Sequence, residues 1–294
     1  MRARHRALSV ALSLAVLASA SGAAAFCQTR GCNDRTQDCE YDEDGCLLSG
    51  HLLHWGSSCI SFDVQQDGSA LRGISYDAAH DAIRAGFAEW LNADCGNGVG
   101  PGIKISDFGP VECRTAEYNQ DSPNANVFMF RDEGWPYENA IDTLALTTLI
   151  FNADTGEIYD ADVEVNTFES AMTIDGTSHG DIDFPSVITH EIGHFLGLSH
   201  SNALGATMRP SYAPGNTAMA SIESDDVEGI CTALSPNRET STNSCEPRHG
   251  FSTECAVPES DCQMAPGSPG GIGSLLLGLL GLSSMLRRRK TPRL

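Results

Sequence analysis

Three histidines in the stretch HEIGHFLGLSH, residues 190–200, have the type and spacing of metal ligands. His190 and His194 are four residues apart, so on a helix they lie on one face and their imidazole nitrogens can converge on a single ion. Gly197 follows them, and glycine tolerates the left-handed conformation that ends a helix. The chain can therefore turn there and bring His200 back as a third ligand.

Three neutral histidines suit a zinc ion that keeps one coordination position open for water. Zinc lowers the pKa of such a water to about 7, which makes hydroxide available near neutral pH. Glu191 is too constrained to join the same three ligands. It can instead reach the water as a general base and pass the proton to a leaving amine. The pattern predicts amide hydrolysis; the alternative is that these are ordinary helix histidines.

A helix over residues 183–198 has to carry the first two histidines. Asp183 signals its start, and Pro185 lies just inside it. Helical spacing of apolar residues predicts an earlier helix over 75–92, and a last helix is expected over 221–234. Strands are predicted where apolar residues alternate or form short runs, with a turn between the last two. The predicted strands are residues 59–64, 103–105, 126–130, 144–151 and 157–165.

The composition describes an acidic globular protein. The chain has 294 residues, of which 41% are hydrophobic, enough for one good-sized domain with a core. Its 39 acidic and 18 basic residues give a net charge of −21, and such a surface repels a phosphate backbone. Nucleic acid is therefore excluded as a partner, and we expect a monomer. The acidity serves solubility or, for some carboxylates, calcium binding.

Residues 1–25 have the features of a secretory signal peptide. A basic start precedes the apolar stretch 7–18, and small residues at 23–25 offer a cleavage site. The short apolar run disfavours a membrane anchor, and Phe26 directly before Cys27 disfavours a lipoprotein signal. We therefore predict a secreted or cell-surface protein.

The chain contains eleven cysteines, which export would leave largely disulfide-bonded. Cys95 and Cys113 are isolated from the others and are predicted to form a local pair. The spacing of the N-terminal cysteines does not suit a zinc ribbon. We divide the chain into the signal peptide, a Cys-rich segment (26–50), one folded domain (51–234), a Cys-containing linker (235–263) and a C-terminal tail (264–294).

The tail contains an uncharged apolar stretch, residues 271–286, followed at once by RRRK. As a helix it would be roughly 24 Å long, slightly short of a bilayer core. Snorkelling arginines could make up the difference, and their position suits a cytoplasmic end. The tail is therefore predicted to be an apolar membrane helix.

The pattern H-E-x-x-H-x-x-G-x-x-H is the metzincin signature of zinc peptidases. Met208, eight residues after the third histidine, with Pro210 and Tyr212 behind it, resembles the matrixins. So do AIRAGFAEW at 82–90 and IESDDVEGI at 222–230. The resemblance covers roughly residues 51–234.

This resemblance implies a two-lobed α+β catalytic domain with a twisted mixed sheet, a zinc-binding helix and a C-terminal helix. It implies an endopeptidase that acts on proteins or peptides. Met208 would form a hydrophobic floor beneath the histidines, and Pro210 and Tyr212 would line a substrate pocket, although Tyr212 could equally be packing. The strand around 144–148 would pair with an extended peptide substrate.

Two further features bear on the matrixin resemblance. Asp160, Asp162 and Glu164 alternate along a predicted strand, and acids in the corresponding matrixin region help to bind calcium; the alternative is a solvated strand face. Residues 26–50 show no counterpart of the cysteine-switch propeptide, which leaves the means of latency open.

The tail resembles the sorting signals of myxobacterial surface proteins, which implies removal of the apolar stretch and attachment at the cell surface. Cys262 is then the candidate for the unpaired cysteine; a plain single-span anchor is the alternative. Three functions are open: an exported zinc endopeptidase, a catalytically inert zinc-stabilised surface adhesion module, and an amidase acting on cell-wall peptides. The presence of Glu191 favours turnover over the inert module.

Overall fold

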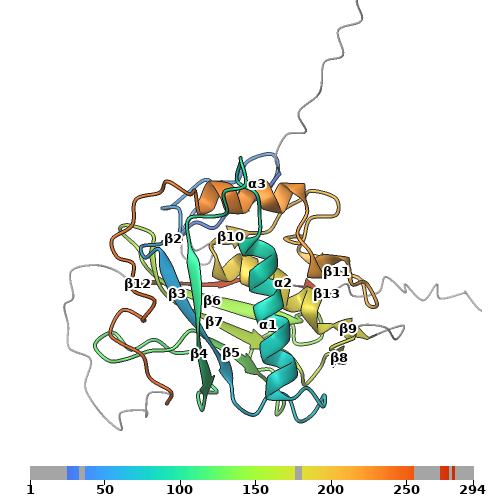
Figure 1. Ribbon diagram of the computed structural model, residues 1–294. Helices are drawn as coiled ribbons and strands as arrows, with labels where there is room; N and C mark the ends of the chain where they lie inside the picture. Colours follow the sequence, from blue (N-terminus) through green and yellow to red (C-terminus); the bar gives the residue numbers. More distant parts are fainter. Residues whose placement is uncertain (1–24, 33–36, 176–180, 255–271, 278–279, 282–294) are drawn as a thin grey trace, which may run out of the picture.

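A central sheet organises the structure, a computed structural model that describes residues 25–32, 37–175, 181–254, 272–277 and 280–281 (Figure 1). The strand order is β12-β6-β7-β5-β3-β4, with β2 also paired to β7. Within this sheet β6 alone runs antiparallel to its neighbours. The strands are β2 (His54–Trp55), β3 (Cys59–Gln65), β4 (Lys104–Val111), β5 (Val127–Phe130), β6 (Ala145–Asn152), β7 (Glu157–Val165) and β12 (Ile272–Leu277).

The helices and the remaining short strands surround this sheet. The helices are α1 (Tyr76–Leu91), α2 (Phe184–Phe195), α3 (Ser224–Ala233) and the 3-10 turn η1 (Ala218–Ala220). The short strands are β1 (Cys27–Gln28), β8 (Met172–Thr173), β9 (Ile182–Asp183), β10 (Leu198–Ser199), β11 (Ser211–Tyr212) and β13 (Leu280–Gly281). The predicted five strands and three helices are all present, so the expected α+β architecture is confirmed.

Helix α1 buries the apolar face that its spacing predicts. The Ser75 side chain caps its start by accepting a hydrogen bond from the Ala78 N–H. The Phe87 ring packs edge-on against Phe128 of β5, in the core between α1 and the sheet. The indole N–H of Trp90 donates to the Thr189 carbonyl at 2.8 Å, which fixes α1 against α2. Helix α1 therefore holds α2 in place.

Helix α3 begins three residues later than predicted. The Asp226 carboxylate accepts a hydrogen bond from the Glu223 N–H at 2.9 Å, which starts the helix at Ser224. Residues before this cap belong to the extended chain that leaves η1. A cap formed by a side chain three residues into the helix thus sets the boundary.

The predicted pairing of Cys95 with Cys113 is wrong. Cys95, just after α1, bonds to Cys231 of α3, with 5.2 Å between their Cα atoms. Cys113 is also disulfide-bonded, but β4 carries it to the other end of the sheet. Isolation along the chain did not imply proximity in space. Further disulfides join Cys27 to Cys46, Cys32 to Cys39 and Cys59 to Cys245. Cys262 lies outside the described residues.

The predicted apolar helix of the tail is wrong for the residues that the structure describes. Ile272–Leu277 form β12, the edge strand of the central sheet, instead of part of a helix. Glycines at 271, 273, 278 and 281 weaken a helix, whereas a sheet edge offers every second backbone group a partner. In the described part of the chain, no helix has the length and apolar character needed to cross a membrane. The predicted signal peptide lies outside the described residues, apart from Ala25.

Candidate metal centre

The three histidines of the sequence pattern come together at the end of α2. The Asp183 side chain caps the start of this helix by accepting from the Ser186 N–H at 3.0 Å. The helix carries His190 and His194 on one face. Gly197 then takes a φ of 100°, a left-handed value that favours glycine, and the chain reverses. His200 follows directly after β10, as the turn predicts.

The ring nitrogens of the three histidines converge on one point. The Nε2 atoms of His190 and His194 are 3.1 Å apart, and those of His194 and His200 are 3.2 Å apart. Tetrahedral zinc with Zn–N bonds of about 2.0 Å holds its nitrogens about 3.3 Å apart. Among the residues that the structure describes, the three histidines form the group of His, Cys, Asp or Glu side chains that lies close enough together to hold one ion.

The opposite ring nitrogens fix the tautomers. Nδ1–H of His190 donates to the Thr207 carbonyl at 2.6 Å, and Nδ1–H of His194 donates to the Leu198 carbonyl at 2.8 Å, because a carbonyl only accepts. Both Nε2 atoms are then unprotonated and aim lone pairs at the same space. Such an arrangement is repulsive unless a cation lies between them. The donor set therefore fits a zinc ion.

Burial keeps these ligands neutral. His190 and His194 are fully buried. Desolvation, with the neighbouring His200 as the next cause, lowers the pKa of His190 to about 3. Desolvation also lowers the pKa of His194 well below its usual value. Neutral imidazole is the form that binds a metal ion, so the two ligands need no deprotonation at neutral pH.

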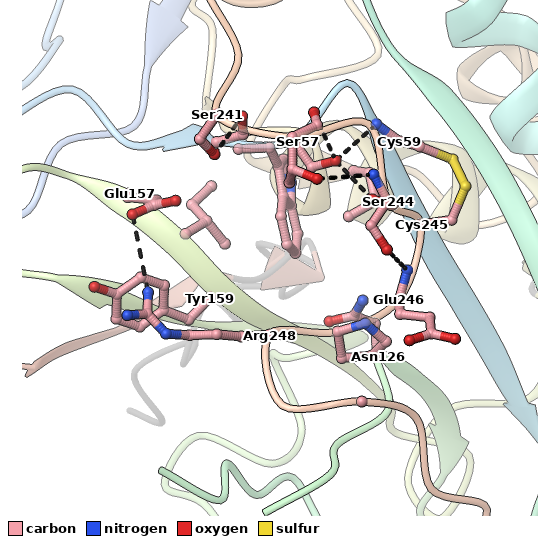
Figure 2. A pocket seen from close by; sticks show the side chains of 17 residues that line it. Ser57, Cys59, Asn126, Glu157, Tyr159, Ser241, Ser244, Cys245, Glu246 and Arg248 are labelled. Carbon is pink, nitrogen blue, oxygen red and sulfur yellow. Dashed lines mark hydrogen bonds and ion pairs between the residues drawn. A yellow bond between two sulfur atoms is a disulfide. The ribbon is translucent and has the colours of Figure 1, made fainter. Parts of the chain in front are cut away.

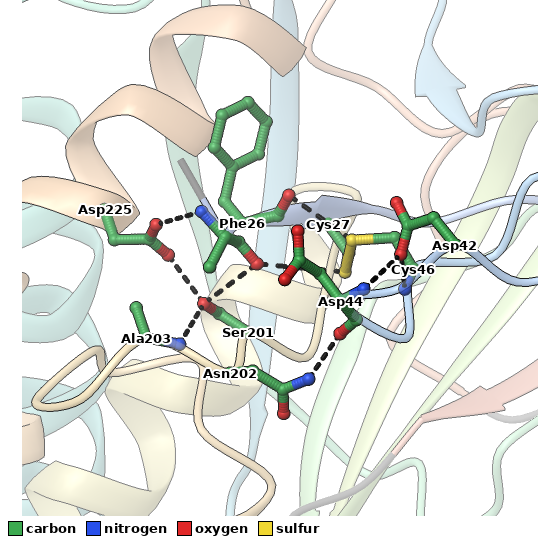
Figure 3. The surroundings of a disulfide bond; sticks show 10 residues. Phe26, Cys27, Asp42, Asp44, Cys46, Ser201, Asn202, Ala203 and Asp225 are labelled. Atoms are coloured by element: carbon green, nitrogen blue, oxygen red, sulfur yellow. Dashed lines mark hydrogen bonds between the residues drawn. A yellow bond between two sulfur atoms is a disulfide. The ribbon is translucent and has the colours of Figure 1, made fainter. Parts of the chain in front are cut away.

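The Cys-rich N-terminal segment braces the third ligand. Strand β1 pairs antiparallel with β10, the strand directly before His200. The Cys27–Cys46 disulfide ties β1 to a later part of the Cys-rich segment. Figure 3 shows this disulfide together with the hydrogen bonds of Ser201 and Asp225. The Ser201 hydroxyl lies 2.6 Å from an Asp225 carboxylate oxygen, and the other oxygen accepts from the Ala25 N–H at 2.8 Å. The loop after His200 is thus held from two sides.

The Glu191 side chain contacts β6. No partner for this carboxylate was predicted from the sequence. The Thr147 hydroxyl donates to the Glu191 carboxylate at 2.6 Å, and both side chains are fully buried. Thr147 lies in the strand that was predicted to bind a peptide backbone. Its inward side chain therefore connects that strand to the predicted general base. Alternation along 144–151 was the only signal that could have identified it.

Thr147→Val is expected to lower kcat for peptide cleavage about tenfold while leaving KM and zinc content near parental values. Valine keeps the shape but removes a hydrogen bond to a charged group, which is worth roughly 1.5–3 kcal/mol. Steady-state kinetics and metal analysis measure the effect. Thr147→Ser, which retains the hydroxyl, is the matched control. Equal kcat values for the valine and serine variants would show that Thr147 does not position Glu191.

Met208 lies directly beneath α2. A Cβ placed on Gly193 would be 2.2 Å from the Met208 sulfur, so the absence of a side chain there lets the thioether approach between the two helical histidines. Met208 is buried, with 2% of its surface exposed. The predicted hydrophobic floor agrees with this position.

Sequence comparisons support the same assignment. Residues 115–233 match the family profile of Matrixin. The chain is matrixin-like. Metalloendoproteinase 1-MMP of Arabidopsis thaliana is 33% identical over 135 residues, 46% of this chain and 33% of that protein. Human Matrilysin is 35% identical over 98 residues, 33% of this chain and 34% of that protein. The chain thus spans about a third of the length of these relatives.

Asp226 is a site residue that sequence analysis did not single out in this matrixin-like domain. Its buried carboxylate accepts from the N–H groups of Thr207 and Met208, at 2.7 and 3.1 Å. The Thr207 carbonyl in turn accepts from His190. Helix α3 therefore orients the predicted ligand His190 through the turn that carries Met208. The only signal in the sequence that could have identified Asp226 was a carboxylate three residues after the residue that caps a helix.

The two residues predicted to line a substrate pocket have different surroundings. Tyr212 is buried, and its hydroxyl accepts from the Asp183 N–H and donates to the Asn216 carbonyl. These bonds tie β11 to the start of the zinc helix, which agrees with the packing alternative. Pro210 is half-buried beside it. A role of either residue in substrate selection stays a prediction.

The alternative of a solvated strand face is wrong for Asp160, Asp162 and Glu164, because all three are buried. Asp162 accepts from two backbone N–H groups, and Glu164 contacts Arg131 and accepts from the Tyr137 hydroxyl at 2.5 Å. The Asp160 carboxylate has no hydrogen-bond partner among the residues that the structure describes. Calcium binding by these acids stays a prediction.

Asp63 of β3 is another buried carboxylate. Burial, followed by the nearby charge of Asp107, raises its pKa to about 8. An unfolded chain releases this proton near pH 4, so between about pH 4 and 8 the folded state holds more protons. The free energy of unfolding should therefore fall as the pH rises through this range.

Asp63→Asn is expected to flatten that dependence and to raise the melting temperature at pH 8, because asparagine stays neutral. Thermal melts from pH 5 to 8 at fixed zinc concentration measure both effects. The exposed Asp154, replaced by Asn, is the control and should retain the parental slope. A parental slope in Asp63→Asn would contradict the assignment.

A separate pocket lies where the C-terminal residues pack on the domain (Figure 2). The Arg248 guanidinium lies 4.1 Å over the Tyr159 ring and 3.9 Å from the Glu157 carboxylate. The Cys59–Cys245 disulfide fastens the same segment to β3. None of the three histidines lines this pocket, so it belongs to the attachment of the predicted linker and not to the metal centre.

Proposed function

We propose that the chain is an exported zinc-dependent endopeptidase that hydrolyses peptide bonds of proteins. The convergence of the three histidine Nε2 atoms, with Glu191 directly after the first histidine in the sequence, is the observation that carries the proposal. The Matrixin match over residues 115–233 and the similarity to metalloendoproteinases support it. The disulfides are consistent with export.

Each residue of the centre has a distinct role in this reaction. His190, His194 and His200 would hold zinc, which supplies a Lewis acid and lowers the pKa of water when bound. Glu191 accepts a proton from the attacking water and delivers it to the departing amine nitrogen. Thr147 holds the Glu191 carboxylate in place. The reaction consumes one water, breaks one C–N bond, and forms a carboxylate and an amine.

The substrate would bind as an extended strand. Strand β6 pairs with β7 along one side, and its other side is the outer edge of the sheet that β12 occupies. A peptide that pairs with this edge needs only main-chain hydrogen bonds, which suits a broad class of protein substrates. Thr147 places the general base beside the same strand. Recognition and hydrolysis therefore use adjacent positions of β6.

Incubation of the purified protein with a mixed-sequence peptide library, with and without a chelator, tests the proposal. Cleavage at internal bonds that stops on chelation and returns with zinc supports the endopeptidase. Zinc binding without cleavage of any peptide would favour the inert adhesion module. Cleavage restricted to cell-wall peptides would favour the amidase. Surface attachment through Cys262, with membrane contact by the tail, is a separate part of the proposal that mass analysis of protein from the host surface would test.

A further inference from the structure

The C-terminal segment lies on the edge of β6 that the proposed function assigns to substrate. Strand β12 pairs antiparallel with β6 over six successive positions, from Ile272 opposite Asn152 to Leu277 opposite Thr147. Antiparallel pairing along a sheet edge is the geometry by which an extended peptide adds a strand. The chain's own tail therefore already fills the hydrogen-bonding positions of that edge.

The same segment also contacts the opposite flank of the metal centre. Strand β13 pairs in parallel with β11, with Leu280 opposite Ser211 and Gly281 opposite Tyr212. Strand β11 begins three residues after Met208, which lies beneath the zinc helix. Figure 1 shows β12 beside β6 and β13 beside β11. One short stretch of chain thus pairs with both β6 and β11.

The position of Glu191 relates these pairings to the chemistry. Leu277, the last residue of β12, lies opposite Thr147, whose hydroxyl donates to the Glu191 carboxylate. The end of β12 therefore lies at the predicted general base. Glu191 itself is fully buried, so a peptide has to displace part of the chain before it reaches the carboxylate. The tail pairs with the strand next to that carboxylate.

The sequence of the tail suits this position. Residues 271–286 contain neither proline nor a charged side chain, so every residue offers a backbone N–H and none carries a charge onto the sheet edge. The tether also favours the contact, because a segment in the same chain is present at an effective concentration of about millimolar. A free peptide would have to compete with it.

We propose that the segment formed by β12 and β13 is a built-in competitor of peptide substrates, bound to β6 and β11 in the manner of a substrate strand. Its inhibitory effect rests on the proposed peptidase activity, whereas its binding does not. The segment would supply a form of latency that residues 26–50 do not explain. Removal or displacement of the tail would then switch the enzyme on.

Two variants of the full chain separate main-chain pairing from side-chain effects. Consecutive residues of a strand point their N–H groups to opposite sides, so prolines at two adjacent positions remove one donor that faces β6. Ser274→Pro with Leu275→Pro should raise kcat/KM for a fluorogenic peptide about tenfold or more. The matched control, Ser274→Thr with Leu275→Ile, retains both N–H groups and should stay near the parental value.

Hydrogen exchange tests binding without any need for activity. In a Glu191→Gln background, those amides of residues 147–152 that face β12 should exchange slowly in the chain with the native tail and at least tenfold faster with the proline pair. Unchanged exchange in the proline pair would overturn the proposal, as would an unchanged kcat/KM in an active enzyme. Faster exchange in a chain that cleaves no peptide would support tail binding and refute the peptidase assignment.

Discussion

Glu191→Gln is expected to lose most peptide cleavage while keeping its zinc and its fold. Glutamine has the same shape and can still accept the Thr147 hydroxyl through its amide oxygen, so packing beneath β6 should survive. It cannot take a proton from the attacking water. Loss of a general acid–base group typically costs roughly a hundredfold to ten-thousandfold in rate. Measurements of kcat/KM, zinc content and melting temperature on the same preparation check all three expectations.

The exposed Glu89 on α1 provides the control for this substitution. Glu89→Gln makes the same chemical change away from the metal centre and should cleave at the parental rate. A Glu191→Gln enzyme within a few-fold of the parent would assign the proton transfer to another group. Loss of zinc in that variant would instead mean that the glutamate is needed for the structure of the site.

His194→Ala is expected to remove most of the bound zinc and, with it, all detectable cleavage. Its Nε2 lies within 3.2 Å of both other ligand nitrogens, so it is the central member of the three. The substitution also leaves the Leu198 carbonyl, which accepts its Nδ1–H, without that donor. Metal analysis should fall from about one zinc per chain to a small fraction, since two histidines alone bind zinc weakly.

Thermal stability gives a second measurement for His194→Ala. A metal that binds only the folded state raises the melting temperature, so the parent should lose stability on chelation and the variant should not. His51→Ala, at an exposed histidine outside the centre, should behave as the parent in both tests. Full zinc content in His194→Ala would contradict the assignment of the ligands.

The metal centre could be predicted from the sequence because its geometry is mostly local. Two ligands lie one helical turn apart, and the third follows a reversal that Gly197 makes possible at a positive φ. These relations depend on backbone conformation over eleven residues and on little else. Apolar periodicity similarly predicted α1 and the five strands, since the spacing of apolar residues indicates which face is buried.

The tail shows where local pattern failed. An uncharged run followed by arginines is typical of a membrane helix, and the glycines within that run weaken a helix without specifying a strand. The outcome depended on a partner: β6 leaves one edge open, and β12 fills it. The Cys95–Cys231 disulfide has the same origin, because it joins the end of α1 to α3 across the fold.

The sequence by itself was enough to predict the three histidine ligands, the general base and the elements that carry them, since each prediction depends on residue type and short-range spacing. Only the tertiary structure decided what surrounds them. It placed Thr147 on Glu191, set Asp226 behind the turn of Met208, buried Asp63 and Asp160, and put the tail on the edge of β6. Each of these contacts joins residues far apart in the chain. Their energies depend on burial and on which backbone groups remain unpaired, and neither exists until the sheet and helices have packed.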